Sequence, residues 1–138
     1  MPGAPSYGEG RSGQALKLTG KSAVRAPLDL SAQGCPQVTI AAWVKFDDSP
    51  TKGTQYILSS GLGGPSLVRD GVNLSVYGGG QRYRQSKALR GGGWEFIATS
   101  LDFEAGKMTV YYRNRVSEKD MGTRGTKQAD IWIGAVDD

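Results

Sequence analysis

Few side chains in this 138-residue chain are suited to catalysis or to binding a transition metal. The sequence contains no histidine and a single cysteine, Cys35. Without an imidazole there is no side chain that titrates near neutral pH as a general base, which excludes hydrolases built on Ser-His or Cys-His pairs. One cysteine forms no internal disulfide, and without a second Cys or a His it builds no zinc site. The remaining chemistry depends on carboxylates, guanidinium groups and aromatic rings.

Paired carboxylates are the first of these groups to consider. Glycosidases cleave a sugar linkage with two carboxylates that face the same ring. Alternate residues of a strand share a face, so Asp102 and Glu104 are a candidate pair. They end an apolar run directly before a turn that contains glycine, where acidic side chains are usually solvated. We therefore expect no catalysis from this pair and no enzymatic activity from the chain.

Cations and rings alternate between residues 82 and 90, where the sequence reads RYRQSKALR, with Tyr77 upstream. Such a run can hold phosphates and stack on bases, and the formal net charge of +4 permits contact with nucleic acid. However, 13 acidic residues are dispersed among the 17 basic ones, and no nucleic-acid-binding motif is present. A solvated strand and loop, or a contact with an acidic protein surface, is the preferred interpretation. A second basic run, residues 113–127, is interpreted as a mobile loop or docking arm.

The composition limits the fold that carries these groups. Glycine fills 21 positions, and each glycine inside a helix costs about 1 kcal/mol relative to alanine, which argues against a helical bundle. The length suits a single domain. No apolar run reaches the roughly 18 residues of a membrane helix. The N-terminus, MPGAPSYGEGRSGQ, has neither the basic start nor the apolar segment of a secretory signal.

Short apolar runs separated by glycine-rich turns predict an all-β chain. The strongest run is 38–46, where Val38, Ile40 and Val44 share one face and Trp43 lies on the other. Residues 94–103 and 108–113 predict a hairpin, whose turn, residues 104–107, contains a glycine that can adopt positive φ. Further strands are predicted at 15–18, 23–26, 56–59, 72–77 and 131–133. Residues 1–13 are predicted to form an N-terminal arm, and residues 14–138 an antiparallel β-sandwich domain.

Six segments carry a family resemblance through their order and spacing. They are VTIAAWVKF (38–46), YILSSG (56–61), GVNLSVYGG (71–79), WEFIATSLD (94–102), MTVYYRN (108–114) and DIWIGA (130–135). This pattern resembles the concanavalin A-like lectin and glucanase superfamily, and within it the laminin G-like jelly-roll domain. The resemblance implies a jelly-roll β-sandwich and places Trp43 and Trp94 in its core. It says little about function, because one fold hosts many functions.

Two departures from the family pattern are visible. The Asn-Gly turn of the family is replaced by Arg113-Asn114-Arg115, which predicts a longer or different turn. Family members also continue into a last strand beside the first one, whereas this sequence ends at Asp138. Because unpaired sheet edges are usually covered, we expect the sheet to be completed by the N-terminal arm or by a strand from a neighbouring molecule, in a homo-oligomer or by strand exchange.

The resemblance also implies candidate ligand sites. Lectin-like members place an exposed ring beneath a sugar, with amides and charged groups at its hydroxyls. The candidate ligand-binding residues on this basis are Tyr77, Tyr83, Asn73, Gln81, Arg82 and Arg84. The Glu-x-Asp-x-x-Glu string of laminarinase-type glucanases is absent, which again favours binding over catalysis.

Calcium is the one cofactor that the resemblance suggests. Many members bind Ca²⁺ at the rim of the sandwich, because this cation requires several oxygen ligands. The candidate ligands are Asp47, Asp48, Asp137 and Asp138. The alternative is that these acidic pairs cap turns and keep the edges soluble, in which case the chain binds no cofactor.

Two functions remain open from the sequence. The first is a structural or accessory role in a large assembly, such as a virion decoration, capsid-stabilising or tail-associated protein, exposed on that particle. It is suggested by an extracellular type of fold without a secretory signal and by the missing strand. The second is a carbohydrate-binding or adhesion module. Protein chains, and in the second case glycans, are the expected partners; nucleic acid and membranes are not expected.

Overall fold

The computed structural model describes residues 4–19, 22–47, 53–60, 64–122 and 130–134, and its regular structure within these ranges is entirely β-strand. The strands are β1 (Ser6–Glu9), β2 (Gln14–Lys17), β3 (Ala23–Ala26), β4 (Gln37–Lys45), β5 (Thr54–Ser59), β6 (Ser66–Asp70), β7 (Asn73–Gly78), β8 (Gln81–Gln85), β9 (Trp94–Asp102), β10 (Lys107–Tyr112), β11 (Arg115–Asp120) and β12 (Ile131–Gly134). The described part of the chain holds no helix that could cross a membrane.

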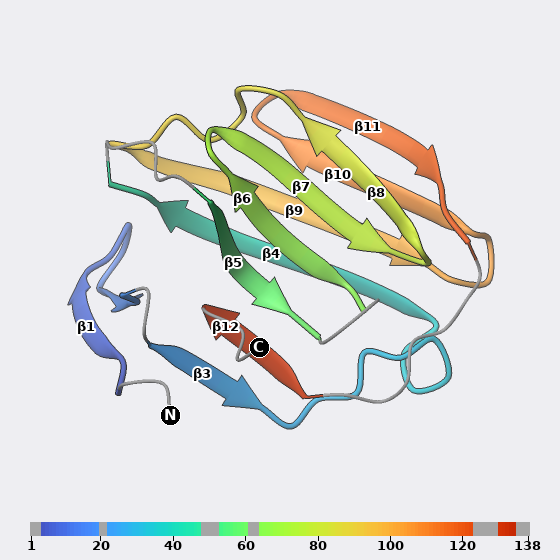
Figure 1. Ribbon diagram of the computed structural model, residues 1–138, viewed down its shortest axis with the longest axis horizontal. Helices are drawn as coiled ribbons and strands as arrows, with labels where there is room; N and C mark the ends of the chain where they lie inside the picture. Colours follow the sequence, from blue (N-terminus) through green and yellow to red (C-terminus); the bar gives the residue numbers. More distant parts are fainter. Residues whose placement is uncertain (1–3, 20–21, 48–52, 61–63, 123–129, 135–138) are drawn as a thin grey trace.

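The strands form two larger antiparallel sheets that pack face to face (Figure 1). One sheet has four strands in the order β11-β10-β9-β4, and the other has six in the order β3-β12-β5-β6-β7-β8. The hairpin of β1 and β2 forms a separate two-stranded sheet beside them. The predicted fold class, an all-β antiparallel sandwich, is therefore confirmed.

The pairing of β4 with β9 confirms the strongest sequence pattern. The two nine-residue strands are in register from Gln37 opposite Asp102 to Lys45 opposite Trp94, without a bulge. Val38, Ile40 and Val44 pack against the core from one face of β4, as their alternation predicts. The predicted β9–β10 hairpin is also present, and its turn contains Gly106 at φ 64°.

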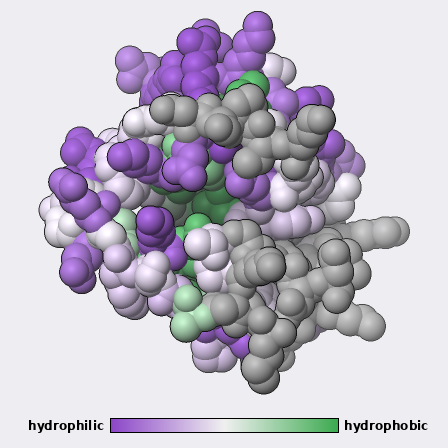
Figure 2. Space-filling model, turned by 60° about the vertical axis from the view of Figure 1, so that its left-hand side comes forward, coloured by the Kyte–Doolittle hydropathy of each residue, from purple (hydrophilic) through white to green (hydrophobic). Residues whose placement is uncertain are grey.

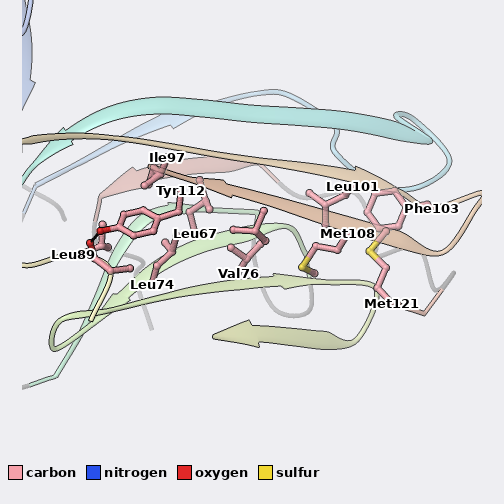
Figure 3. Close-up of a cluster of buried hydrophobic side chains, with 12 residues drawn as sticks. Leu67, Leu74, Val76, Leu89, Ile97, Leu101, Phe103, Met108, Tyr112 and Met121 are labelled. Atoms are coloured by element: carbon pink, nitrogen blue, oxygen red, sulfur yellow. Dashed lines mark hydrogen bonds between the residues drawn. The ribbon is translucent and has the colours of Figure 1, made fainter. Parts of the chain in front are cut away.

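The core lies between the two sheets (Figure 3). Its apolar side chains come from the inner faces of β6 and β7 on one side and of β9 and β10 on the other, with further residues from the connecting loops. The fully buried members are Leu67, Leu74, Val76, Ala88, Leu89, Ile97, Leu101, Phe103, Met108, Val110, Tyr112 and Met121. Tyr112 adds a polar anchor, because its hydroxyl donates a hydrogen bond to the carbonyl of Ala88. Seen from one end of the molecule, apolar side chains are mainly recessed between hydrophilic ones (Figure 2).

The core positions inferred for the tryptophans are wrong. Trp43 is 48% exposed, because the alternation that turns Val44 inward turns Trp43 onto the outer face of the four-stranded sheet. Trp94 is half-buried and lies outside the buried cluster. Trp43 instead stacks in a tilted arrangement on Phe96, its partner on β9, with 5.3 Å between the ring centroids.

The apolar patterns of the sequence missed two strands that contain charged residues, β6 and β11. β6 contains Arg69 and Asp70, yet it lies in the middle of the six-stranded sheet. Of the run 113–127, expected as a mobile loop or docking arm, residues 115–120 form the edge strand β11, so a loop is the wrong expectation for them, and residues 123–127 lie outside the described residues. The β10–β11 turn is not longer than the family turn, since Tyr112 pairs with Arg115 across a two-residue turn in which Arg113 has φ 51°. Positive φ at the first central residue matches the twist of a hairpin.

The predicted N-terminal arm contains a strand. β1 pairs with β2 from Ser6 opposite Lys17 to Glu9 opposite Gln14 and, within the described ranges, with no other strand. The arm thus pairs with the first predicted strand, as one of the two expectations for that edge had it, but the two strands form a separate hairpin and not part of either large sheet. Completion of a sheet by a neighbouring molecule remains a prediction.

The β7–β8 turn offers a direct stability test, because its two glycines differ in their surroundings. Gly79 and Gly80 both have positive φ, but only at Gly79 would an added Cβ overlap a backbone atom, the carbonyl oxygen of Gly122. We expect Gly80→Ala to cost about 1 kcal/mol through backbone strain alone. Gly79→Ala should lower the free energy of unfolding clearly further, as measured by urea denaturation. Equal losses for the two variants would contradict the close approach of Gly122.

Candidate functional site

The outer face of the six-stranded sheet brings together several residues singled out in the sequence. Leu74 and Val76 of β7 point into the core, so Ser75 and Tyr77 point outward. The register of β7 with β8 places Arg84 opposite Ser75 and Arg82 opposite Tyr77. We call these outward residues, together with Tyr56, Val68 and Asp70 on β5 and β6, the outer-face site.

The floor of the outer-face site consists of small side chains that are sunk between larger ones. Val68 and Ser75 are opposite each other on neighbouring strands and are 1% and 0% exposed, although both point away from the core. Tyr56, opposite Val68 on the other side, is 40% exposed, and Tyr77 is half-buried. The Cα atoms of the two tyrosines are about 12 Å apart, from two strand spacings and a two-residue offset.

Arg82 is held in place by three neighbours. Its guanidinium Nε and Nη2 atoms lie 3.3 Å and 3.0 Å from the hydroxyl oxygen of Ser75, to which they donate. The guanidinium carbon is 5.5 Å from the centroid of the Tyr77 ring, and Nη2 is 3.5 Å from a carboxylate oxygen of Asp70. Arg84 lies 4.0 Å from the same oxygen. One carboxylate therefore faces two guanidinium groups, which leaves this side of the site with a net positive charge.

The other predicted ligand-binding residues do not join this arrangement. Tyr83 faces inward, packs against the core, and donates a hydrogen bond from its hydroxyl to Gln85 Oε1 at 2.9 Å. The Asn73 amide is used within the fold, because Nδ2 donates to the carbonyl of Asp70 and Oδ1 accepts from the Lys87 amide. Gln81 is exposed at the turn between β7 and β8. Tyr77, Arg82 and Arg84 are thus the three candidates that the structure brings together.

Sequence reasoning missed Tyr56, Val68 and Asp70. Tyr56 begins a run that was recognised as a strand, and its alternation with Ile57 could have marked it as outward. Val68 and Asp70 lie on β6, which was not predicted, so their place beside β7 had no signal in the sequence. Trp132 of β12 belongs to the same outer face, since it lies opposite Ser59 of β5, and is half-buried.

The calcium prediction remains untested. Asp47 is exposed at the end of β4, and Asp48, Asp137 and Asp138 lie outside the described residues. Among the residues that the structure describes, no three acidic, cysteine or histidine side chains gather in a way that could hold a metal ion. Asp102, one of the two acidic residues considered as a catalytic pair, has hydrogen-bond partners within the fold. It accepts hydrogen bonds from Gln37 Nε2 and from the backbone amide of Ala105.

A second polar group, Arg69, lies inside the sandwich. Its side chain is fully buried, donates from Nη1 to Gln55 Oε1 at 3.2 Å, and stacks on Phe46 with 4.4 Å from the guanidinium carbon to the ring centroid. Nε and Nη2 have no hydrogen-bond partner within the described part of the chain. Burial lowers the pKa of Arg69, and the carboxylates of Glu95 and Asp47 act in the opposite direction. The guanidinium is therefore only partly satisfied by its surroundings.

Comparison with known proteins finds similarity in structure but not in sequence. No protein-family model matches the chain, and no curated protein is significantly similar to it in sequence. Among solved structures, it is similar to a protein of Bacteroides ovatus ATCC 8483 that is provisionally described as a carbohydrate binding protein. The TM-score is 0.56 at 22% sequence identity, and the match covers 71% of this chain but 30% of that longer one. The likeness shows the fold, an all-β sandwich.

Replacing Arg69 tests whether its guanidinium stabilises the fold. Arg69→Met keeps an apolar stem over Phe46 and removes donors that lack partners, so we expect the free energy of unfolding to change by less than about 1 kcal/mol, or to rise. Leu67→Ala, two positions earlier on the same face of β6, is the control and should cost about 2–5 kcal/mol. A loss for Arg69→Met as large as that for Leu67→Ala would show that the guanidinium has strong partners.

Proposed function

We propose that the chain is a non-catalytic carbohydrate-binding module that takes a glycan on the outer-face site. The single observation that supports this most is the placement of two outward tyrosines, Tyr56 and Tyr77, on the same sheet face as Arg82, Arg84 and Asp70. Tyr77 and Tyr56 offer apolar ring faces to the C–H groups of a sugar. We further infer that the fold is the concanavalin A-like, laminin G-like type of sandwich that the sequence resembles.

The polar groups of the site suit the hydroxyl groups of a sugar. Arg82 and Arg84 supply several N–H donors in fixed orientations, and Asp70 between them supplies acceptors. Because Arg82 is already oriented by Ser75 and Tyr77, little side-chain entropy is lost when it donates to a ligand. An apolar platform with a few placed polar groups is the usual composition of a small-molecule site.

The likeness to the Bacteroides protein supports the same proposal, since that longer chain is provisionally described as binding carbohydrate. A structural role in an assembly, the first reading of the sequence, has support of a different kind, namely an unpaired sheet edge that invites protein contact. Neither the fold nor the structural neighbour connects the chain with virions or capsids.

Glycan binding tests the proposal directly. The purified chain is first screened against a glycan panel, and the best ligand is then titrated by calorimetry into the parent chain and its variants. Tyr77→Ala and Tyr56→Ala should each weaken binding by about 30-fold, which corresponds to about 2 kcal/mol for an anchoring aromatic residue. Tyr111→Ala, which removes an exposed ring from the other sheet, is the matched control and should leave affinity unchanged.

Two results would contradict the proposal. One is a folded parent chain that binds no glycan in the panel. The other is saturable binding that survives both Tyr77→Ala and Tyr56→Ala but is lost with Tyr111→Ala, which would move the site to the four-stranded sheet.

A further inference from the structure

The positive charge of the chain is concentrated in the strands that carry the outer-face site. Between Thr54 and Arg90 the sequence has a single acidic residue, Asp70. The basic residues of the same segment are Arg69, Arg82, Arg84, Lys87 and Arg90. This gives the segment a formal charge of +4, as large as the net charge of the whole chain. A ligand of the outer-face site therefore meets a positive field.

Asp70 is one carboxylate between two guanidinium groups of the site. The same oxygen lies 3.5 Å from Nη2 of Arg82 and 4.0 Å from Nη2 of Arg84. The side chains of Asp70, Arg82 and Arg84 are 41%, 42% and 52% exposed, so a ligand can reach all three. Within the described residues Arg84 has no other charged partner. One positive charge of the site thus remains for an anion that the ligand brings.

The ion pairs of Lys107, on the other large sheet, show the opposite arrangement. Its ammonium group lies 3.3 Å from Glu118 Oε1 and 2.6 Å from Asp120 Oδ1, so that one cation serves two carboxylates. From residue 94 to residue 122, five acidic residues outnumber four basic ones. The excess of cations around Asp70 is therefore a property of the outer-face site and not of the surface in general.

Arg82 has an orientation that protection of a sheet edge does not require. A charge that only prevents pairing at the edge strand β8 needs no fixed orientation. The guanidinium of Arg82 instead lies over the sheet face, where Nε and Nη2 donate to the hydroxyl of Ser75 and the guanidinium carbon is 5.5 Å from the centroid of the Tyr77 ring. Nη1 takes part in none of the contacts to described residues. It is a donor beside the proposed sugar platform.

A sugar with an anionic group matches this arrangement of ring and cations. Tyr77 lies directly opposite Arg82 on the neighbouring strand, so a sugar ring against Tyr77 has its substituents next to the guanidinium groups. Guanidinium groups bind oxyanions through parallel N–H···O hydrogen bonds, and such charge-assisted bonds are about twice as strong as neutral ones. Sugars carry oxyanions as the carboxylates of uronic acids or as sulfate esters.

We propose that the ligand of the outer-face site is an acidic glycan, whose carboxylate or sulfate group binds at Arg82 and Arg84 while its sugar ring lies against Tyr77. This inference rests on the proposed function, the binding of a glycan on the same face. A single strand of DNA also brings anions and rings, but its backbone offers no donor to the carboxylate of Asp70. The hydroxyl groups of a glycan do donate to a carboxylate, so they suit the position of Asp70 between the arginines.

Matched pairs of ligands test the proposal on the full chain. Oligogalacturonate is compared with its methyl ester, and a sulfated galactan oligosaccharide with its desulfated form, each by calorimetry at low salt. The charged member of at least one pair should bind about 10-fold more tightly, which corresponds to about 1.4 kcal/mol. The pair that shows the difference identifies a carboxylate or a sulfate as the group recognised. Salt at about 0.5 M should remove most of the difference, because it screens exposed charges.

Two variants with opposite expected effects locate the anion. Arg84→Gln removes a charge but keeps a hydrogen-bond donor, and should weaken binding of the charged ligand by about 5- to 10-fold while binding of its neutral partner is unchanged. Asp70→Asn removes the carboxylate that competes for the arginines, and should strengthen binding of the charged ligand. Arg115→Gln makes the same charge change at an exposed position of β11 in the other sheet, and as the matched control should change neither affinity.

The outcomes separate this proposal from the proposed function. Charged and neutral glycans that bind with equal affinity, and that both require Tyr77, are compatible with a carbohydrate-binding module but overturn the acidic ligand. Failure of every glycan to bind overturns both. A preference for charged glycans that Arg115→Gln reduces as much as Arg84→Gln does, or equally tight binding of single-stranded DNA, also overturns the acidic glycan, because the chain would then bind polyanions in general.

Discussion

The two-residue alternation of β9, paired on both sides, is the constraint on which the rest of the structure depends. Its register with β4 and β10 turns Ile97 and Leu101 into the core and Phe96 and Ala98 outward. A shift by one residue would exchange these two sets, so the register also decides which rings reach solvent. The buried hydroxyl of Tyr112, held by the Ala88 carbonyl, ties this sheet to the loop that follows β8.

Because each sheet has one face in the core, each presents one face to solvent, and the two outer faces differ in chemistry. That of the six-stranded sheet carries tyrosines beside arginines, with Arg82 over Ser75 and Tyr77, and is the face for which we propose a polar ligand. That of the four-stranded sheet carries the Trp43–Phe96 pair beside an unprotected edge, which suits another protein chain.

The sequence predicted the fold class and three of the seven residues of the outer-face site, and the limits have physical reasons. Apolar alternation revealed β4, whose inward residues are all apolar, and β9, whose Ile97 and Leu101 face the core. It could not reveal β6, because Arg69 occupies an inward position that apolar patterns assign to a hydrophobic residue. Without β6 the neighbours of Tyr77 could not be inferred, and Val68 and Asp70 were missed. The resemblance placed Trp43 in the core against the alternation of its own strand, and the alternation proved correct.

The central claim is that ligand binding takes place on the outer face of the six-stranded sheet. An amide NMR titration with the best glycan from the panel tests it most directly, since it locates the contact without altering any residue. The account predicts saturable shifts that centre on Tyr56, Val68, Tyr77 and Arg82, with the β4 and β9 amides unchanged. Shifts that centre on Trp43 and Phe96, with Tyr77 and Arg82 unchanged, would contradict it.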